Sequence, residues 1–470
     1  MSALLHDVRA TLMPGFAGTT LPTWVADRLG DGLASVCLYG ENAPDAATLR
    51  GLAGAVRAVR ADAIVAIDEE GGDVTRIHYA TGAPYPGAAV LGRADDVGWT
   101  RDVGARVGRD VRAAGATLTF GPVADVNVDP RNPVIGVRSF GADAALAARH
   151  VAAWVAGVQS TGVAASAKHF PGHGDTAVDS HLGLPIVHAS EGVLRSRELA
   201  PFRAAIEAGV ATIMTSHIVL PAFDDVPATL SSRILQGLLR DELGFAGVIV
   251  SDALDMAGAS GETGIPEAAV RALAAGCDLL CLGTATGAEG MAAIEEAVLA
   301  AVDDGRLARS RLAEAAARVR ALAAAAPPPT LDEVAGVDDD ELDRIAATFS
   351  LSEHASAWLQ RFRGADRTTT VVRIERAANI AAGAVPWDPF DAAVVVEPGV
   401  VPELEPGPVV VVGKDLERGD ATRATIDGLR ARHDVLAIDL GWSTGEVADV
   451  ATFGASAAVG AAVRRWIERA

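Results

Sequence analysis

Three histidines and two aspartates fall within fourteen residues, in the stretch Lys168-His169-Phe170-Pro171-Gly172-His173-Gly174-Asp175-Thr176-Ala177-Val178-Asp179-Ser180-His181. A single histidine beside a strand is usually structural, but here Asp179 precedes His181 by two positions. A carboxylate so placed can orient an imidazole and raise its basicity. Gly172 and Gly174 give the loop backbone freedom to move over a bound ligand. We predict that Asp179 and His181 form an acid/base pair.

The same stretch allows another interpretation, a zinc site built from His169, His173 and His181. The ligand spacings that are common on helices are absent, and Cys277 and Cys281 have no His or Cys pair at ligand spacing. We therefore favour the acid/base interpretation, and expect no metal and no other cofactor.

A second candidate is Asp252, which ends the apolar run Phe245-Ala-Gly-Val-Ile-Val-Ser251. A carboxylate at the carboxyl end of a barrel strand lies on the catalytic face, where it can act as a nucleophile. The alternative is that Asp252 caps the following helix, a common role for Ser-Asp after a strand. Taken alone, this stretch does not decide between the two roles.

The elements that position these residues repeat along the chain to about residue 325. Short β-branched runs end in polar or glycine residues and alternate with Ala/Leu/Arg-rich stretches of helical spacing, which is typical of βα units. The eight expected strands are Thr11–Phe16, Ser35–Tyr39, Ala63–Asp68, Thr117–Val123, Ala164–His169, Thr212–His217, Gly247–Asp252 and Asp278–Leu282. Eight parallel strands close a barrel and bring their polar ends to one face, whereas an open doubly wound sheet needs no eight similar units.

The run Ala323–Pro329 contains three consecutive prolines, which cannot continue a helix. We therefore predict an α/β fold: a (β/α)8 TIM-like barrel followed by a smaller α/β sandwich domain. The expected parts are a catalytic barrel at 1–326, a proline-rich linker with a connecting helix at 327–366, and the small domain at 367–470. Five strand-like runs are expected in the small domain: Thr368–Ile374, Ala392–Val396, Val409–Val412, Val435–Ile438 and Val450–Phe453.

Composition restricts the partners. The net charge of −21 without a basic stripe argues against nucleic acid, and no apolar run reaches the 18 residues of a membrane span. The first residues lack a basic start followed by a long apolar segment, and the three cysteines favour a reducing compartment, so we expect a cytoplasmic protein. Lys168 and Lys414 are the only lysines among 40 basic residues, which hints that position 168 requires a compact ammonium.

The stretch 168–176 followed by Asp179-Ser180-His181 resembles the signature of the β-N-acetylhexosaminidase branch of glycoside hydrolase family 3. Other matching pieces follow in family order: Pro14-Gly15-Phe16, Asp68-x-Glu70-Gly71-Gly72 with Arg76, Arg138-Ser139-Phe140-Gly141, Met214-Thr215-Ser216-His217, Pro227-Ala228-Thr229-Leu230-Ser231 and Gly247-Val-Ile-Val-Ser251-Asp252. Two positions depart from the family pattern, since Glu69 stands where Gln is frequent and Asp73 where Arg is frequent.

The resemblance implies that Asp252 is the nucleophile and that His181 is the proton donor, with Asp179 as its partner. The residues it assigns to the amino sugar are Asp68, Arg76, Arg138, Lys168 and His169, and we add His217 from its matching piece. No site is carried onto the C-terminal domain.

The expected activity is that of a retaining β-N-acetylhexosaminidase, which releases terminal β-linked N-acetylglucosamine through a covalent glycosyl-Asp intermediate. Its partner is then a small glycoside or oligosaccharide, from recycled cell-wall peptidoglycan or from chitin. Three alternatives stay open: a phosphorylase that uses phosphate as acceptor, a family 3 β-glucosidase or xylosidase, and an inactive sugar-binding module.

Overall fold

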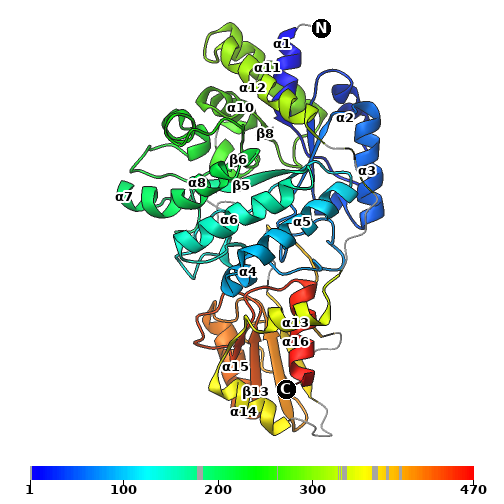
Figure 1. Cartoon of the computed structure of the whole chain (residues 1–470), viewed down its shortest axis with the longest axis vertical. Helices are drawn as coiled ribbons and strands as arrows, with labels where there is room; N and C mark the ends of the chain where they lie inside the picture. Colours follow the sequence, from blue (N-terminus) through cyan, green and yellow to red (C-terminus); the bar gives the residue numbers. More distant parts are fainter. Residues whose placement is uncertain are drawn as a thin grey trace.

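The computed structural model describes residues 3–176, 184–261, 263–326, 328, 330, 336–362, 369–376, 381–390 and 394–469. Two predicted catalytic residues, Asp179 and His181, lie outside the described residues. The chain forms a larger N-terminal barrel and a smaller α/β unit, which lie end to end with the C-terminus in the smaller one (Figure 1).

Each of the eight strands expected in the barrel is present; seven are shorter than the sequence suggested, and β5 extends one residue further, to Phe170. They are β1 (Leu12–Met13), β2 (Ser35–Leu38), β3 (Ile64–Ile67), β4 (Leu118–Thr119), β5 (Ala164–Phe170), β6 (Thr212–Thr215), β7 (Val248–Val250) and β8 (Leu280–Cys281). All neighbours pair in parallel, in the order β2-β3-β4-β5-β6-β7 and β1-β8. This arrangement confirms the predicted fold class.

Three contacts close the barrel between the two sheets. A parallel bridge joins Val250 to Leu279, and the backbone N–H of Ser251 donates to Leu279 at 2.9 Å, so β7 is linked to β8. On the other side of β1, the N–H of Cys37 donates to the carbonyl of Pro14 at 3.0 Å. The carboxyl ends of all eight strands therefore share one face.

The strands alternate between two apolar environments, as a parallel sheet that is buried on both faces requires. In β3, Ala66 belongs to the cluster inside the barrel, whereas Val65 and Ile67 pack against the surrounding helices. In β7 the pattern is the same, with Val250 inside and Ile249 outside.

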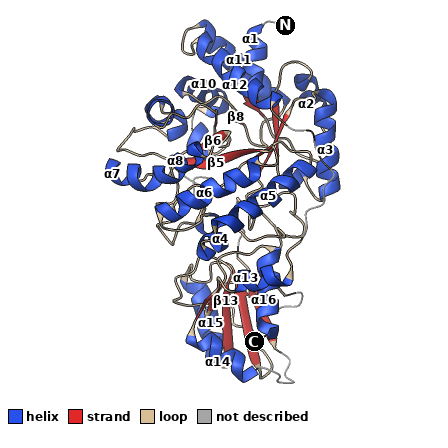
Figure 2. Cartoon of the chain, viewed as in Figure 1, coloured by secondary structure: helices blue, strands red, loops and turns tan. Residues whose placement is uncertain are grey.

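Helices surround the strands (Figure 2). They are α1 (Ala3–Ala10), α2 (Thr23–Leu29), α3 (Ala46–Val59), α4 (Ala88–Ala94), α5 (Val97–Ala113), α6 (Ala144–Gln159), α7 (Glu191–Val193), α8 (Leu199–Glu207), α9 (Ala257–Ser260), α10 (Gly264–Ala275), α11 (Ala288–Asp303) and α12 (Arg309–Ala324). Three 3-10 helices are η1 (Gly40–Asn42), η2 (Gly136–Arg138) and η4 (Ala228–Leu230), and two π-helices are η3 (Leu194–Glu198) and η5 (Arg233–Glu242). Aspartates cap three of the helices, because Asp45, Asp96 and Asp143 each accept a backbone N–H of the first turn. Within the described residues, no helix is both long and apolar enough to cross a membrane.

The C-terminal unit contains a second sheet of six strands in the order β11-β10-β12-β13-β14-β9. Its strands are β9 (Ser350–Leu351), β10 (Thr370–Ile374), β11 (Val394–Val396), β12 (Pro408–Gly413), β13 (Asp434–Asp439) and β14 (Val450–Ala451). Only β9 runs antiparallel, and it lies in the stretch expected to be linker and connecting helix. The two-residue pairing of β9 with β14 gives too short a run for a sequence pattern to reveal.

The second sheet is covered on both faces. Its helices are α13 (Asp339–Ala346), α14 (Glu353–Phe362), α15 (Asp420–Arg430) and α16 (Ala457–Arg469). In β12, Val409 and Val411 pack in the same cluster as Ile426 of α15, whereas Val410 and Val412 share a cluster with Val459 of α16. The unbroken valine run of β12 reflects this double burial.

Candidate active site

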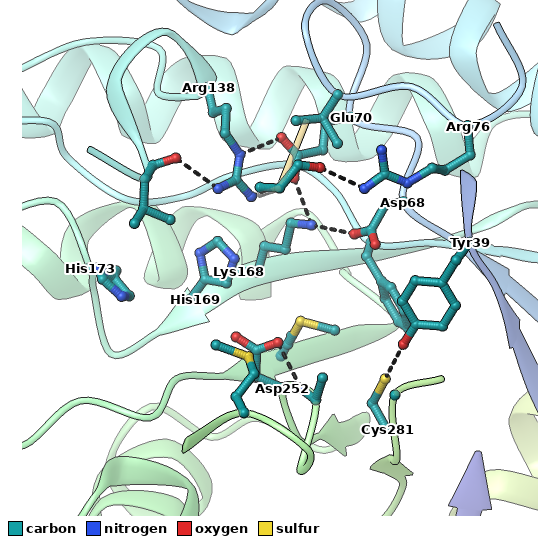
Figure 3. A pocket seen from close by; sticks show the side chains of 18 of the residues that line it. Tyr39, Asp68, Glu70, Arg76, Arg138, Lys168, His169, His173, Asp252 and Cys281 are labelled. Carbon is teal, nitrogen blue, oxygen red and sulfur yellow. Dashed lines mark hydrogen bonds and ion pairs between the residues drawn. The ribbon is translucent and has the colours of Figure 1, made fainter. Parts of the chain in front are cut away.

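The carboxyl ends of the barrel strands surround a cavity of about 230 Å³ (Figure 3). Side chains that lie in or follow the seven strands β2 to β8 line it, together with Ala381 from the C-terminal unit. Its chemically active lining residues are Tyr39, Asp68, Glu70, Arg76, Arg138, Lys168, His169, His173, Asp252, Asp255 and Cys281. The barrel therefore brings together Asp252 and five of the six residues that the sequence assigned to substrate binding.

Lys168 lies at the centre of the polar wall. Its ammonium nitrogen is 2.8 Å from Asp68 Oδ1 and 2.7 Å from Glu70 Oε1 (Figure 3). Burial lowers the pKa of Lys168, but the charges of Asp68 and Glu70 outweigh it and raise the pKa above its ordinary value. Lys168 is therefore charged at neutral pH, and its compact ammonium contacts two carboxylates at once.

Glu70 also receives a two-pronged contact from Arg138, with Nε and Nη2 at 2.9 and 2.7 Å from its two carboxylate oxygens. Burial raises the pKa of Glu70, yet the charges of Arg138 and Lys168 hold it below the ordinary value. The remaining Arg138 nitrogen, Nη1, donates to the carbonyl of Val134 at 2.9 Å. These contacts fix the donors of the pocket in one geometry.

His169 is oriented by Asp125, a buried carboxylate that the sequence analysis did not assign to the site. The ring nitrogen Nδ1 is 2.7 Å from Asp125 Oδ2, and because a carboxylate only accepts, Nδ1 donates. The other ring nitrogen is then left to face the pocket. Burial raises the pKa of Asp125, but the interactions with His169 and His173 lower it by more. The pKa therefore lies below its ordinary value, and the carboxylate is ionised.

His173 is buried in the wall of the cavity, and neither of its ring nitrogens has a hydrogen-bond partner within the described residues. Its backbone is held on both sides, since its N–H donates to Asp125 at 2.7 Å and its carbonyl accepts from Asn132 at 2.9 Å. Burial lowers the pKa of His173 to about 4, so the ring is neutral at neutral pH. A neutral imidazole offers one donor and one acceptor, which suits a hydroxyl or amide group of a ligand.

Asp252 follows β7 and is half-buried at the cavity. One carboxylate oxygen accepts the N–H of Ala253 at 2.8 Å, but the next helix, α9, begins only at Ala257. Met256, not Asp252, holds the N-cap position of α9. The alternative role of Asp252 as a helix cap is therefore wrong.

His217 is the exception among the expected sugar-binding residues. It is fully buried, and its ring contacts Thr229 Oγ1 at 2.9 Å and the carbonyl of Ala253 at 3.0 Å. The ring thereby supports the backbone beside Asp252, and His217 is not among the described residues that line the cavity, so its contact with a sugar stays a prediction.

Asp255 adds a second carboxyl group near Asp252. Burial raises the pKa of Asp255, and the nearby charge of Asp252 raises it further. The close approach of Asp255 depends on Gly283, where a Cβ atom would lie 1.8 Å from Asp255 Oδ2 and the backbone has φ of +70°. Only glycine satisfies both conditions without strain.

Arg76 lines the cavity, but its guanidinium donates to backbone carbonyls of the C-terminal unit, at 3.1 Å to Ala382 and 2.6 Å to Ala381.

Among the described residues, no group of three His, Cys, Asp or Glu side chains is arranged to hold a metal ion.

Sequence reasoning missed Glu70, Asp125 and His173 as site residues. Two of them stood in segments already singled out, because Glu70 precedes Gly71-Gly72 and His173 lies between two glycines. The available signal was the density of polar residues at strand ends, which marks a segment without telling which side chains face the cavity.

Comparison with known proteins identifies the family. The family model described as the glycosyl hydrolase family 3 N terminal domain matches residues 20–322, more than half of the chain. A beta-hexosaminidase from Pseudomonas aeruginosa is 36% identical over 289 residues, which cover 59% of this chain and 83% of that protein. The beta-hexosaminidase A of Pseudoalteromonas piscicida is 35% identical over 287 residues, and the match spans only 48% of that longer protein and 56% of this chain.

Similarity extends over both parts of the chain in one solved structure. It is a glycoside hydrolase family 3 beta-N-acetylglucosaminidase from Paenibacillus sp. str. FPU-7, with a TM-score of 0.86 and 28% identity, covering 100% of this chain and 97% of that one. The chain is therefore a glycoside hydrolase that belongs to family 3, in its β-hexosaminidase branch.

Proposed function

We propose that the protein is a retaining β-N-acetylhexosaminidase that releases terminal β-linked N-acetylglucosamine. The observation that carries the proposal is the cavity itself, where the strand-end carboxylate of Asp252 faces the same space as the paired groups around Lys168. Paired donors and acceptors of this kind bind the hydroxyl groups of a neutral sugar and hold the ring for attack.

In the proposed mechanism, Asp252 attacks the anomeric carbon while His181 donates a proton to the leaving oxygen. The glycosyl ester on Asp252 is then hydrolysed by a water molecule from which His181 removes a proton, so the anomeric configuration is retained. Asp179 orients the imidazole. A histidine with a pKa near neutrality can take both proton-transfer roles without the burial that a carboxylic acid requires.

The natural substrates we propose are cell-wall fragments in peptidoglycan recycling or chitin oligosaccharides, processed in the cytoplasm. The three free, buried cysteines support a reducing compartment.

Trapping with a 2-fluoro or 5-fluoro N-acetylglucosamine analogue followed by mass spectrometry tests the nucleophile. The label is expected on the peptide that contains Asp252, and a label on any other residue refutes the assignment. Replacing His181 by glycine is expected to slow substrates with poor leaving groups far more than activated aryl glycosides. Equal slowing of both would remove His181 from the acid role.

Comparing the aryl β-N-acetylglucosaminide with the aryl β-glucoside tests the sugar. Faster cleavage of the glucoside would favour the β-glucosidase alternative. The same assay with and without phosphate tests the acceptor, for which one observation favours phosphate: Arg76 lines the cavity with no carboxylate at ion-pair distance among the described residues. Formation of N-acetylglucosamine 1-phosphate would show that the enzyme is a phosphorylase and not a hydrolase.

A further inference from the structure

The C-terminal unit contacts the barrel segment that follows β3 and carries Asp68 and Glu70. Its first contact is an ion pair 2.6 Å long between Lys414 Nζ and Asp73 Oδ2. The other oxygen of Asp73 accepts the backbone N–H of Ala455 at 2.7 Å. Both oxygens of this barrel carboxylate are therefore occupied by the C-terminal unit.

Two further residues of the same segment make contacts across the boundary. Besides the two carbonyl contacts of Arg76 described above, the hydroxyl of Tyr79 accepts the N–H of Ala384 at 3.1 Å. Ala381, one of the partners of Arg76, itself lines the cavity. The C-terminal unit thus supplies part of the pocket wall.

The barrel segment after β3 has little regular structure of its own. The strand β3 ends at Ile67, and Gly71 and Gly72 follow with φ of +76° and +80°. Two glycines in this region leave the backbone many alternatives. Glu69 restrains the segment from the barrel side by accepting the backbone N–H groups of Arg76 and Ile77, and the C-terminal unit restrains it from the opposite side.

A second contact reaches the loop that carries Arg138. Arg418 Nη2 donates to the carbonyl of Asn132 at 2.5 Å. The side chain of Asn132 in turn donates to the carbonyl of His173 and accepts the N–H of Val134. Both loops that form the polar wall of the pocket are therefore in contact with the C-terminal unit.

The ion pair also neutralises a buried charge. The side chain of Asp73 is only 6% exposed. The cation that faces it within the described residues is Lys414, one of the two lysines of the chain. A buried carboxylate requires a partner, and here the partner comes from a segment 341 residues away.

We propose that the C-terminal unit is a positioning element of the sugar pocket, in which Lys414 holds Asp73 and thereby fixes the segment that bears Asp68 and Glu70. The carbonyls of Ala381 and Ala382 hold Arg76 at the rim of the same pocket. This inference rests on the proposed function, since it assigns the pocket to the amino sugar. Lys414 and Asp73 act through other residues and do not touch the substrate.

The test measures kcat and KM with 4-nitrophenyl N-acetyl-β-D-glucosaminide, and binding of N-acetylglucosamine by calorimetry, on the full-length protein. We expect Lys414→Ala to lower kcat/KM by about tenfold or more, because small displacements of positioning groups have effects of this size. Most of the change is expected as a higher KM with weaker binding of N-acetylglucosamine. Lys414→Arg should recover most of the loss.

Charge exchange gives a stricter criterion. Asp73→Lys and Lys414→Asp are each expected to weaken binding, and the double variant should bind better than either. The control is Arg344→Ala, which removes an exposed ion pair with Asp96 between α13 and α5, away from the cavity. It is expected to leave kcat and KM unchanged.

A folded Lys414→Ala protein with kcat/KM within twofold of the wild type overturns the inference. If Lys414→Ala does not fold, Tyr79→Phe is the variant that tests the inference. It removes a single hydrogen bond between the same segment and the C-terminal unit, and it is expected to raise KM about threefold. An unchanged KM in Tyr79→Phe is then the refuting result. Wild-type protein that neither cleaves nor binds the amino sugar refutes the proposed function, which is a different outcome from an active wild type with unaffected variants.

Discussion

Replacement of Glu70 by glutamine should destabilise the protein and weaken its pocket at once. Three charge-assisted hydrogen bonds end on Glu70, two from Arg138 at 2.9 and 2.7 Å and one from Lys168 at 2.7 Å. Glutamine preserves the shape but keeps one oxygen, and it turns an amide NH2 group toward a cation. Removing one partner of a buried ion pair costs about 3–5 kcal/mol, and we expect Glu70→Gln to lower the free energy of unfolding by that amount.

The pH dependence of this effect has a defined sign. The charges of Arg138 and Lys168 overcome burial and hold the pKa of Glu70 below 4.5, its ordinary value. The stabilisation from Glu70 is therefore complete above pH 4.5 and is lost as the pH falls through the lowered pKa. The difference between wild type and Glu70→Gln should be constant between about pH 5 and 8 and should shrink in more acidic solution.

Urea unfolding at a series of pH values measures the free energy of unfolding. The value of kcat/KM with the aryl N-acetylglucosaminide measures the effect of the substitution on catalysis in the pocket. The matched control is Glu403→Gln, because Glu403 is 92% exposed and its ion pair with Arg432 is on the surface. An exposed pair contributes about 0–1 kcal/mol. If the two glutamine variants are equally stable, the buried charge cluster does not stabilise the fold as we argue.

Three other substitutions test separate features. Burial lowers the pKa of His173 from 6.5 to about 4, so stability should fall as the pH drops through that window, and His173→Gln should remove about 3 kcal/mol of this loss; parallel stability curves for both proteins in urea titrations would contradict the pKa. His217→Ala removes the support under the carbonyl of Ala253 and is expected to lower kcat about tenfold with little change in KM, and a change confined to KM would instead indicate direct sugar contact. Gly283→Ala forces a Cβ atom against Asp255 at positive φ and should cost about 1–3 kcal/mol, seen as a lower melting temperature; an unchanged melting temperature would show that Asp255 can move aside.

The strands of the barrel could be predicted because each is a short apolar run that ends in polar residues, and the strand ends then converge by topology alone. The side on which each polar residue lies could not. In the sequence Asp68-Glu69-Glu70, the first and third side chains reach Lys168, whereas Glu69 turns inward and accepts the N–H groups of its own loop. Alternation along an extended backbone gives this outcome, but only after the phase is fixed by tertiary contacts.

Long-range partners were beyond the reach of sequence patterns. Asp125 stands two positions after the expected strand Thr117–Val123, and only the folded barrel places it against the ring of His169. In the same way Asp73 and Lys414 stand 341 positions apart, and no sequence pattern pairs one with the other. Ion pairs of this kind are set by the packing of two units, which leaves no local periodicity.

The charge balance of the cavity fits a neutral substrate better than a charged one. Its described lining carries the cations Arg76, Arg138 and Lys168 and the carboxyl groups Asp68, Glu70, Asp252 and Asp255. The protein as a whole has a net charge of −21, so a near-neutral cavity is a local property of paired groups and not an average of the surface. Such a cavity offers directed hydrogen bonds instead of a long-range field, and in the proposed mechanism the positive charge that develops on the anomeric carbon interacts mainly with Asp252.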